Sequence, residues 1–238
     1  SRPPAEGEVT TLNAPEDIYI DGKGMLYIAD AGNGRIAIFD QAGNYVRSVG
    51  KGTLSRPTGV CVGQDGSIYV ADNGNSKIYR FTAGGEVTLE AGRPESPLYG
   101  KGRFDPVKIA VDGAGTMYVV SAGAVNGLVQ LNTDGAFLGY FGGNMARADL
   151  LRSIQRLIFT DEQLQKLSSV IPPTVSNVAV GADGLVYTST QTPSNDAIKR
   201  FNVAGSNLLK NMIGISATIS DLTVDAMGNI LAVDFENG

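Results

Sequence analysis

Four polar or charged residues occupy the same kind of place in the sequence, directly before a short apolar run. They are Asp17 before Ile-Tyr-Ile, Lys108 before Ile-Ala-Val, Asn177 before Val-Ala-Val, and Asp221 before Leu-Thr-Val. Oxygen atoms of Asp, Glu and Asn side chains are the ligands that Ca²⁺ prefers. With the neighbouring Glu16 included, the candidate calcium ligands are Glu16, Asp17, Asn177 and Asp221.

Lys108 complicates a metal site, because its positive charge would repel a cation bound beside it. The alternative is an arrangement without metal, in which Lys108 pairs with Asp17 or Asp221 and the group lines a wet channel. A site for a small ligand is a third possibility. The channel or ligand-binding candidates are therefore Glu16, Asp17, Lys108, Asn177 and Asp221.

Composition restricts the chemistry that these residues can perform. The 238 residues include no histidine and one cysteine, Cys61. Catalytic pairs and metal sites that need histidine are excluded, as are intramolecular disulfides. Catalysis would depend on a metal-bound water or a carboxylate base.

The formal net charge of −5 and the lack of a basic cluster argue against a nucleic-acid partner. Cys61, between Val60 and Val62, is expected to be a buried apolar residue.

The elements that carry the polar residues repeat along the chain. Tyr27 and Tyr69 are 42 positions apart, as are Asp30 and Asp72. Each copy has an apolar run, an Asp/Gly turn and a second run, and copies one to four add a third run. Five copies are visible, and they start at Ala14, Pro57, Pro106, Ser176 and Ser220. Short β-branched and aromatic runs separated by turns predict antiparallel hairpins, and runs that are apolar on both faces predict covered sheets. Units of this length predict an all-β fold, a β-propeller of four-stranded blades.

The copies resemble the NHL repeat, whose pattern is Pro-x-Gly-Ile-Ala-Val-Asp, then Gly-x-Ile-Tyr-Val-Ala-Asp, then Asn-x-Arg-Ile-x-x-Phe. The first two copies match closely, whereas Ser121 and Thr190 replace the second Asp in copies three and four. The resemblance implies that this Asp, present as Asp30 and Asp72, makes polar contacts inside the blade. Its loss in later copies is therefore not expected to threaten the fold.

The resemblance also implies a single propeller domain over residues 1–238 and a ring of six blades, of which about five are visible. We therefore expect the chain to be a fragment of a longer protein, truncated at its C-terminal end. Residues 8–12 are a candidate for the strand that closes such a ring.

Copies three and four are separated by an insertion. Tyr118 and Tyr187 are 69 positions apart, and the excess lies in residues 144–173. Apolar residues recur there at helical spacing, and Pro172-Pro173 ends the pattern, which predicts a helical hairpin packed on the propeller. The alternative is a lid or partner-docking element. Its polar side would then present Arg147, Arg152 and Arg156.

Two classes of function fit these features. First strands of propeller blades line the axial channel, so matching positions are expected to form a ring there. The first class, which we favour, is a binding or scaffold module for a protein, peptide or glycan. Resemblance to bacterial NHL proteins that are called gluconolactonase-like implies a bacterial, extracytoplasmic protein, secreted or attached to a membrane through other parts of a parent protein.

The second class is a calcium-dependent, lactonase-like hydrolase that uses the channel ring, in which the metal would polarise a lactone carbonyl. NHL-type lyases, which depend on histidine, are disfavoured because this chain has none.

Overall fold

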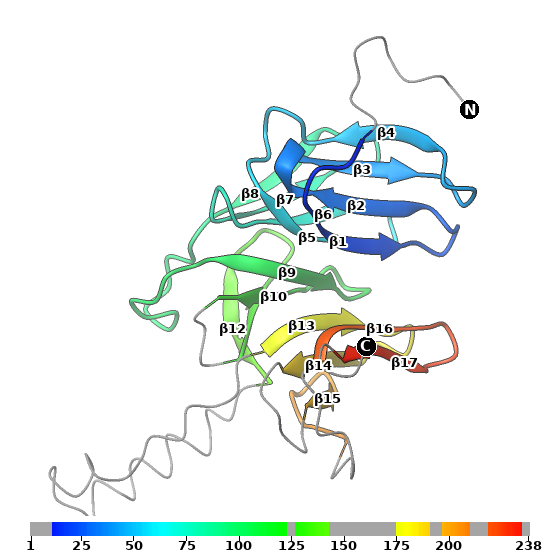
Figure 1. Ribbon diagram of the computed structural model, residues 1–238. Coiled ribbons are helices and arrows are strands. Elements are labelled where there is room, and N and C mark those ends of the chain that lie inside the picture. The colour runs from blue at the N-terminus through cyan, green and yellow to red at the C-terminus, as the bar shows by residue number, and fades with distance from the viewer. Residues whose placement is uncertain (1–10, 123–126, 143–174, 191–196, 210–218, 235–238) are drawn as a thin grey trace, which may run out of the picture.

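The structure, a computed structural model, describes residues 11–122, 127–142, 175–190, 197–209 and 219–234 (Figure 1). These residues form five antiparallel sheets, which we call blades one to five. Blade one contains β1 (Pro15–Ile20), β2 (Leu26–Asp30), β3 (Arg35–Phe39) and β4 (Tyr45–Val49). Blade two contains β5 (Pro57–Val62), β6 (Ile68–Asp72), β7 (Lys77–Phe81) and β8 (Val87–Ala91).

The remaining blades follow the same order. Blade three contains β9 (Pro106–Val111), β10 (Met117–Ser121), β11 (Leu128–Leu131) and β12 (Phe137–Phe141). The described strands of blade four are β13 (Val175–Val180), β14 (Val186–Thr190) and β15 (Ile198–Phe201). Those of blade five are β16 (Ile219–Val224) and β17 (Ile230–Asp234). The described chain has one short 3-10 turn, η1 (Ala31–Asn33), and contains no helix with the length and hydropathy of a membrane span.

Within each blade, strands that follow one another in sequence are neighbours in the sheet. The blades are in turn arranged side by side in an arc, with β1 at one end and β16 and β17 at the other (Figure 1). The first strand of each blade packs on the first strand of the next, from β1 through β5, β9 and β13 to β16. The predicted all-β propeller architecture is thereby confirmed.

Two predictions from the sequence fall outside the residues that the structure describes. One is the helical insertion at residues 144–173, together with its partner-docking candidates Arg147, Arg152 and Arg156. The other is most of the candidate closing strand at residues 8–12; its described residues, Thr11 and Leu12, form no strand.

Turns between first and second strands are built by a repeated Asp. In blade one, Oδ1 of Asp21 accepts hydrogen bonds from the backbone N–H groups of Lys23 (2.8 Å) and Met25 (2.9 Å). The Asp side chain thereby satisfies two N–H groups of the turn that would otherwise bind water. Asp112 and Asp225 do the same in blades three and five. The residue with a positive φ angle in the blade-three turn is Gly115 (82°).

The core lies between neighbouring sheets. Apolar side chains from both faces of β6 and β10 are almost fully buried, because a blade covers each of these sheets on both sides. Tyr69, Tyr118 and Tyr187 are buried at equivalent positions, as the repeat predicts. The matching Tyr27 is only half-buried, since blade one has a neighbouring sheet on one face alone among the described residues.

Buried Asp residues at the ends of β2 and β6 fix the loops that lead into blades one and two. Asp30 accepts the N–H of Asn13 (2.7 Å) and pairs with the buried guanidinium of Arg35 (2.8 Å). Asp72 accepts the N–H groups of Ser55 (2.8 Å) and Arg56 (2.7 Å). These contacts confirm the predicted role inside the blade.

Blade three makes the same connection with a neutral group. The hydroxyl of Ser121 accepts the N–H of Asp105 at 2.9 Å, which explains why a blade can lose the Asp and keep the fold. Lys77, which occupies in blade two the position of Arg35, does not pair with Asp72 but with the exposed carboxylate of Glu90 on β8.

Substituting Asp30→Ala is expected to lower the free energy of unfolding by about 3 kcal/mol, because it leaves the charge of Arg35 buried without its carboxylate. Urea unfolding followed by circular dichroism measures this loss. Adding Arg35→Met should restore part of it, since the pair is then replaced by an apolar group. The control Asp134→Ala, on an exposed turn, should change stability by no more than about 0.5 kcal/mol. Equal effects of the two Asp substitutions would contradict the anchoring role of Asp30.

Candidate functional site

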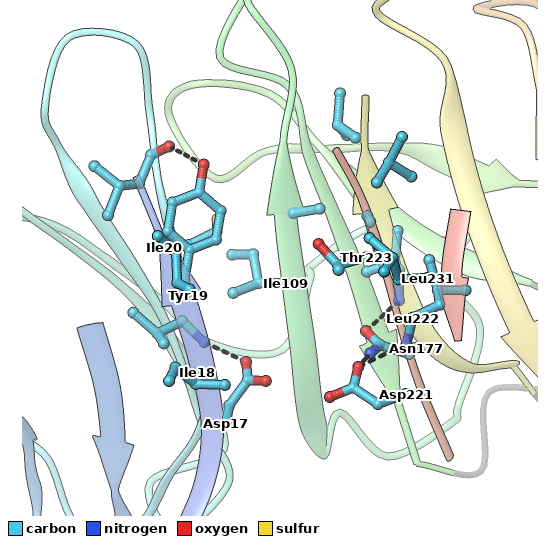
Figure 2. Close-up of a pocket in the computed structure, with 18 of the residues that line it drawn as sticks. Asp17, Ile18, Tyr19, Ile20, Ile109, Asn177, Asp221, Leu222, Thr223 and Leu231 are labelled. Carbon is cyan, nitrogen blue, oxygen red and sulfur yellow. Dashed lines mark hydrogen bonds between the residues drawn. The ribbon is translucent and has the colours of Figure 1, made fainter. Parts of the chain in front are cut away.

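The ring predicted from the sequence surrounds one end of an axial cavity. The cavity has a volume of about 520 Å³ and is lined by the first strands of all five blades and by β17. Figure 2 shows Asp17 and Asp221 at the same end, on opposite sides of the cavity, with their carboxylates pointing toward each other. Asn177 lies beside Asp221, whereas Tyr19 and Ile20 are farther along the wall.

Asp17 and Lys108 form an ion pair at this end of the cavity. The ammonium group of Lys108 donates a hydrogen bond to Oδ1 of Asp17, and both side chains are nearly buried. Lys108 also lies 3.4 Å from the backbone oxygen of Glu16, and Oδ2 of Asp17 accepts the N–H of Val60 at 2.9 Å. Of the pairings considered from the sequence, the structure shows Lys108 with Asp17.

Burial raises the pKa of Asp17 above its ordinary value, because the charged carboxylate loses water. Lys108 and the Val60 amide lower this pKa again, but not enough to cancel the effect of burial. The charge of Asp221, across the cavity, adds a smaller rise.

Asp221 has neutral partners. The carboxamide of Asn177 donates a hydrogen bond to Oδ1 of Asp221, and the N–H of Leu222 donates to the same oxygen at 2.8 Å. Within the described part of the chain, none of the ion pairs involves Asp221. Among the described residues, Lys108 balances the charge of Asp17, whereas no cationic side chain is paired with Asp221.

Glu16, the fifth candidate, contributes its carboxylate elsewhere. It pairs with Arg56 at 2.8 Å, and both side chains are largely exposed.

In blade two the ring position is Gly59, where a Cβ atom would come within 2.7 Å of the Val107 oxygen and 2.8 Å of Cα of Lys108. Close approach of β5 and β9 therefore requires glycine in this blade.

The calcium set fits this arrangement poorly. Lys108 holds Asp17 and Arg56 holds Glu16, so two of the proposed ligands already have cationic partners. Among the described residues, no group of three His, Cys, Asp or Glu side chains is arranged to hold a metal ion. The calcium site stays a prediction from the sequence, and no chemical step is assigned to it.

The cavity walls are mainly apolar, with a few polar groups that sequence reasoning missed. Tyr19 lies on the wall, and its hydroxyl donates to the Val62 oxygen at 3.3 Å. Burial raises the pKa of Tyr19 to about 12, so the hydroxyl stays protonated. The sequence does distinguish Tyr19 from its equivalents. Copies two to four have Cys61, Ala110 and Ala179 at that position, and only copy one has a large polar residue there.

Cys61 is buried in the wall, as predicted, and burial raises the pKa of its thiol. A thiol that resists ionisation is a poor nucleophile. The structure therefore supports the expectation that Cys61 is an apolar wall residue.

Removing Lys108 should strengthen the dependence of stability on pH. Because the folded-state pKa of Asp17 lies above its ordinary 3.8, the folded protein binds a proton more tightly than the unfolded chain, and this contribution to stability falls as pH rises through that interval. Lys108→Met raises the pKa of Asp17 further. We expect it to cost about 3 kcal/mol at pH 7 and much less in acid, below the raised pKa. Urea unfolding across this pH range measures the effect.

The double variant Asp17→Asn/Lys108→Met is the matched control, and it should lose the added pH dependence. A penalty of the same size at every pH would show that Lys108 stabilises the fold by packing and not through the charge of Asp17.

Comparisons with known proteins agree with this architecture. Residues 54–81 match the NHL repeat family model. No curated protein matches this sequence. A streptogramin B lyase structure superposes with a TM-score of 0.63 at 16% identity, covering 92% of this chain and 62% of that chain. Virginiamycin B lyase from Staphylococcus aureus gives a TM-score of 0.60 at 15% identity, covering 92% of this chain and 63% of that chain.

Hydrazine synthase from Kuenenia stuttgartiensis gives a TM-score of 0.60 at 16% identity, covering 98% of this chain and 60% of that chain. This chain thus spans less than two thirds of these similar structures. Likeness at such low identity shows a shared fold and no shared activity. The chain is therefore an all-β propeller that carries an NHL repeat in its second blade.

Proposed function

We propose that this propeller is a binding module whose ligand, a protein, peptide or glycan, places a chemical group in the axial cavity. The observation that carries the proposal is the convergence of repeat-equivalent polar residues at one end of an otherwise apolar cavity. A few placed polar groups within apolar walls are typical of ligand sites. The ring positions are also where this chain departs from the glycine of the repeat pattern.

The chemistry of the cavity favours a peptide group with an apolar stem and a positive end. Walls formed by residues such as Val60, Ile109 and Val180 suit aliphatic carbons better than the hydroxyl groups of a glycan. Asp221, which takes part in none of the ion pairs among the described residues, lies where such a group would end. A lysine side chain has both features, because its methylene chain packs on apolar surface and its ammonium donates to carboxylates.

The proposed setting is extracytoplasmic and bacterial, with any membrane attachment supplied by parts of a parent protein. Support comes from the resemblance of the repeats to bacterial NHL proteins. Peptides and secreted proteins are available as ligands in that setting.

Replacing Asp221 tests the binding site. Isothermal titration calorimetry with hexapeptides that carry one Lys among Leu and Ala residues should detect binding, and the same peptides with Gln in place of Lys should bind more weakly. Asp221→Asn should weaken binding of the Lys peptides at least about 10-fold, or 1.4 kcal/mol. It should leave the Gln peptides nearly unaffected.

Asp134→Asn is the matched control, since it removes the same charge from an exposed turn. Cellohexaose serves as the glycan probe. Failure of the peptides and of cellohexaose to bind, or equal effects of the Asp221 and Asp134 substitutions, would count against the proposal.

A calcium-dependent, lactonase-like hydrolase is the second candidate, because Asp17, Asn177 and Asp221 do share one cavity. It requires that Ca²⁺ raise the melting temperature and that Asp221→Asn abolish the rise. We expect no rise in the unmodified chain, since Lys108 already neutralises Asp17. A calcium-dependent shift together with hydrolysis of a model lactone would reverse the ranking of the two candidates.

A further inference from the structure

The polar end of the cavity contains two carboxylates whose partners differ. Asp17 on β1 and Asp221 on β16 point their carboxylates toward each other across the cavity (Figure 2). Both oxygens of Asp17 accept hydrogen bonds, Oδ1 from the ammonium of Lys108 and Oδ2 from the N–H of Val60. Asp221 accepts hydrogen bonds from neutral donors, a carboxamide and a backbone N–H. One carboxylate thus has a cationic partner and the other has polar, neutral ones.

Lys108 is held firmly beside Asp17. The Lys108 side chain is 12% exposed and that of Asp17 is 11% exposed, so dissolved salt screens the pair less than it screens a surface pair. The ammonium also lies 3.4 Å from the backbone oxygen of Glu16. A lysine of blade three is therefore positioned by two oxygen atoms of blade one.

Blade two, which lies between these blades, leaves space for the contact. Its ring residue is Gly59, where a Cβ atom would come within 2.8 Å of Cα of Lys108. A side chain at this position would collide with the backbone from which the lysine extends. Because glycine has none, β5 and β9 approach closely and Lys108 reaches Asp17 past blade two.

The charges of Lys108 and Asp221 both act on Asp17, in opposite directions. Lys108 lowers the pKa of Asp17, whereas Asp221 raises it. The three groups therefore lie close enough to influence one another electrostatically. Among the described ring residues, two carboxylates and one ammonium sum to a net charge of −1.

This balance favours a guest with a single positive charge. Such a guest neutralises the ring, whereas a doubly charged guest leaves the ring positive and is repelled by the ammonium of Lys108. A divalent cation also gives up more hydration when it enters a buried site, and only nearby negative charge can offset that cost. The ammonium beside Asp17 removes part of that negative charge.

We propose that Lys108 is a specificity-determining residue, which reduces the negative charge at the polar end of the cavity so that the cavity takes a singly charged group and rejects a divalent cation. The proposal deepens the binding function given above, and it rests on that function for the identity of the singly charged ligand. The cation that balances Asp17 is then a side chain of the protein itself and not a bound ion.

Lys108→Met tests the proposal, because it leaves the carboxylates of Asp17 and Asp221 facing each other without a cationic partner. Ca²⁺ is the doubly charged probe, since carboxylate and amide oxygens are among its preferred ligands. In about 10 mM Ca²⁺ we expect the melting temperature of Lys108→Met to rise by at least about 3 °C. That of the unmodified chain should change by less than about 1 °C.

Further variants separate the role of the charge from that of packing. Asp17→Asn/Lys108→Met and Asp221→Asn/Lys108→Met should each lose the response to Ca²⁺, because the ion needs both carboxylates. Lys108→Arg keeps the positive charge and should not acquire the response. Lys23→Met is the matched control, since it removes the same charge from an exposed turn at the other end of β1, and it should not acquire the response either.

A response to Ca²⁺ in the unmodified chain or in Lys23→Met, or no response in Lys108→Met, would overturn the proposal. If Lys108→Met is unfolded without ligand, Ca²⁺ should restore its circular dichroism signal, and failure to do so counts equally against the role of Lys108. The Lys hexapeptides keep this test distinct from the binding function. Peptides that do not bind the unmodified chain contradict the binding function, whereas the response of Lys108→Met to Ca²⁺ is measured without any peptide.

Discussion

Sheets that are apolar on both faces must be covered on both faces, and the arrangement of this protein follows from that constraint. Neighbouring residues of β6 show it directly, since Val70 and Ala71 lie on opposite faces of the sheet and both are fully buried. Burial of apolar surface is the main favourable term in folding. A four-stranded sheet cannot bury both of its own faces, so stability comes from stacking sheets, and stacking about an axis brings the first strands together.

Polar contacts then fix where each blade begins. Asp30 and Asp72 bind the N–H groups of the loop before the first strand, and Ser121 does so in blade three. Because these contacts set the position of the first strand, they also set where the ring residues point. The ion pair of Asp17 with Lys108 therefore depends on anchors of blades one and three that lie outside the cavity.

Much of this was accessible from the sequence, because the repeat places equivalent residues at equivalent points. Spacing and turn residues predicted the blades and the ring that brings Asp17, Lys108, Asn177 and Asp221 together. The ion-pair partners of these residues were harder to predict, because they depend on how far each side chain reaches across the axis. Lys108 pairs with Asp17 and not with Asp221, and Glu16 pairs with Arg56. The place of Tyr19 in the cavity wall was not predicted, because the equivalent residues in copies two to four are small and do not mark this position as part of a site.

Gly59 gives the polar end of the cavity a rotational asymmetry. Blades one, three, four and five contribute an acid, a base, an amide and an acid, while blade two contributes bare backbone, because β5 and β9 approach too closely for a side chain. A bound group that turned about the axis would meet a different neighbour at each step. One rotational setting should then be preferred over the others, and the cavity would distinguish the two hands of a chiral guest.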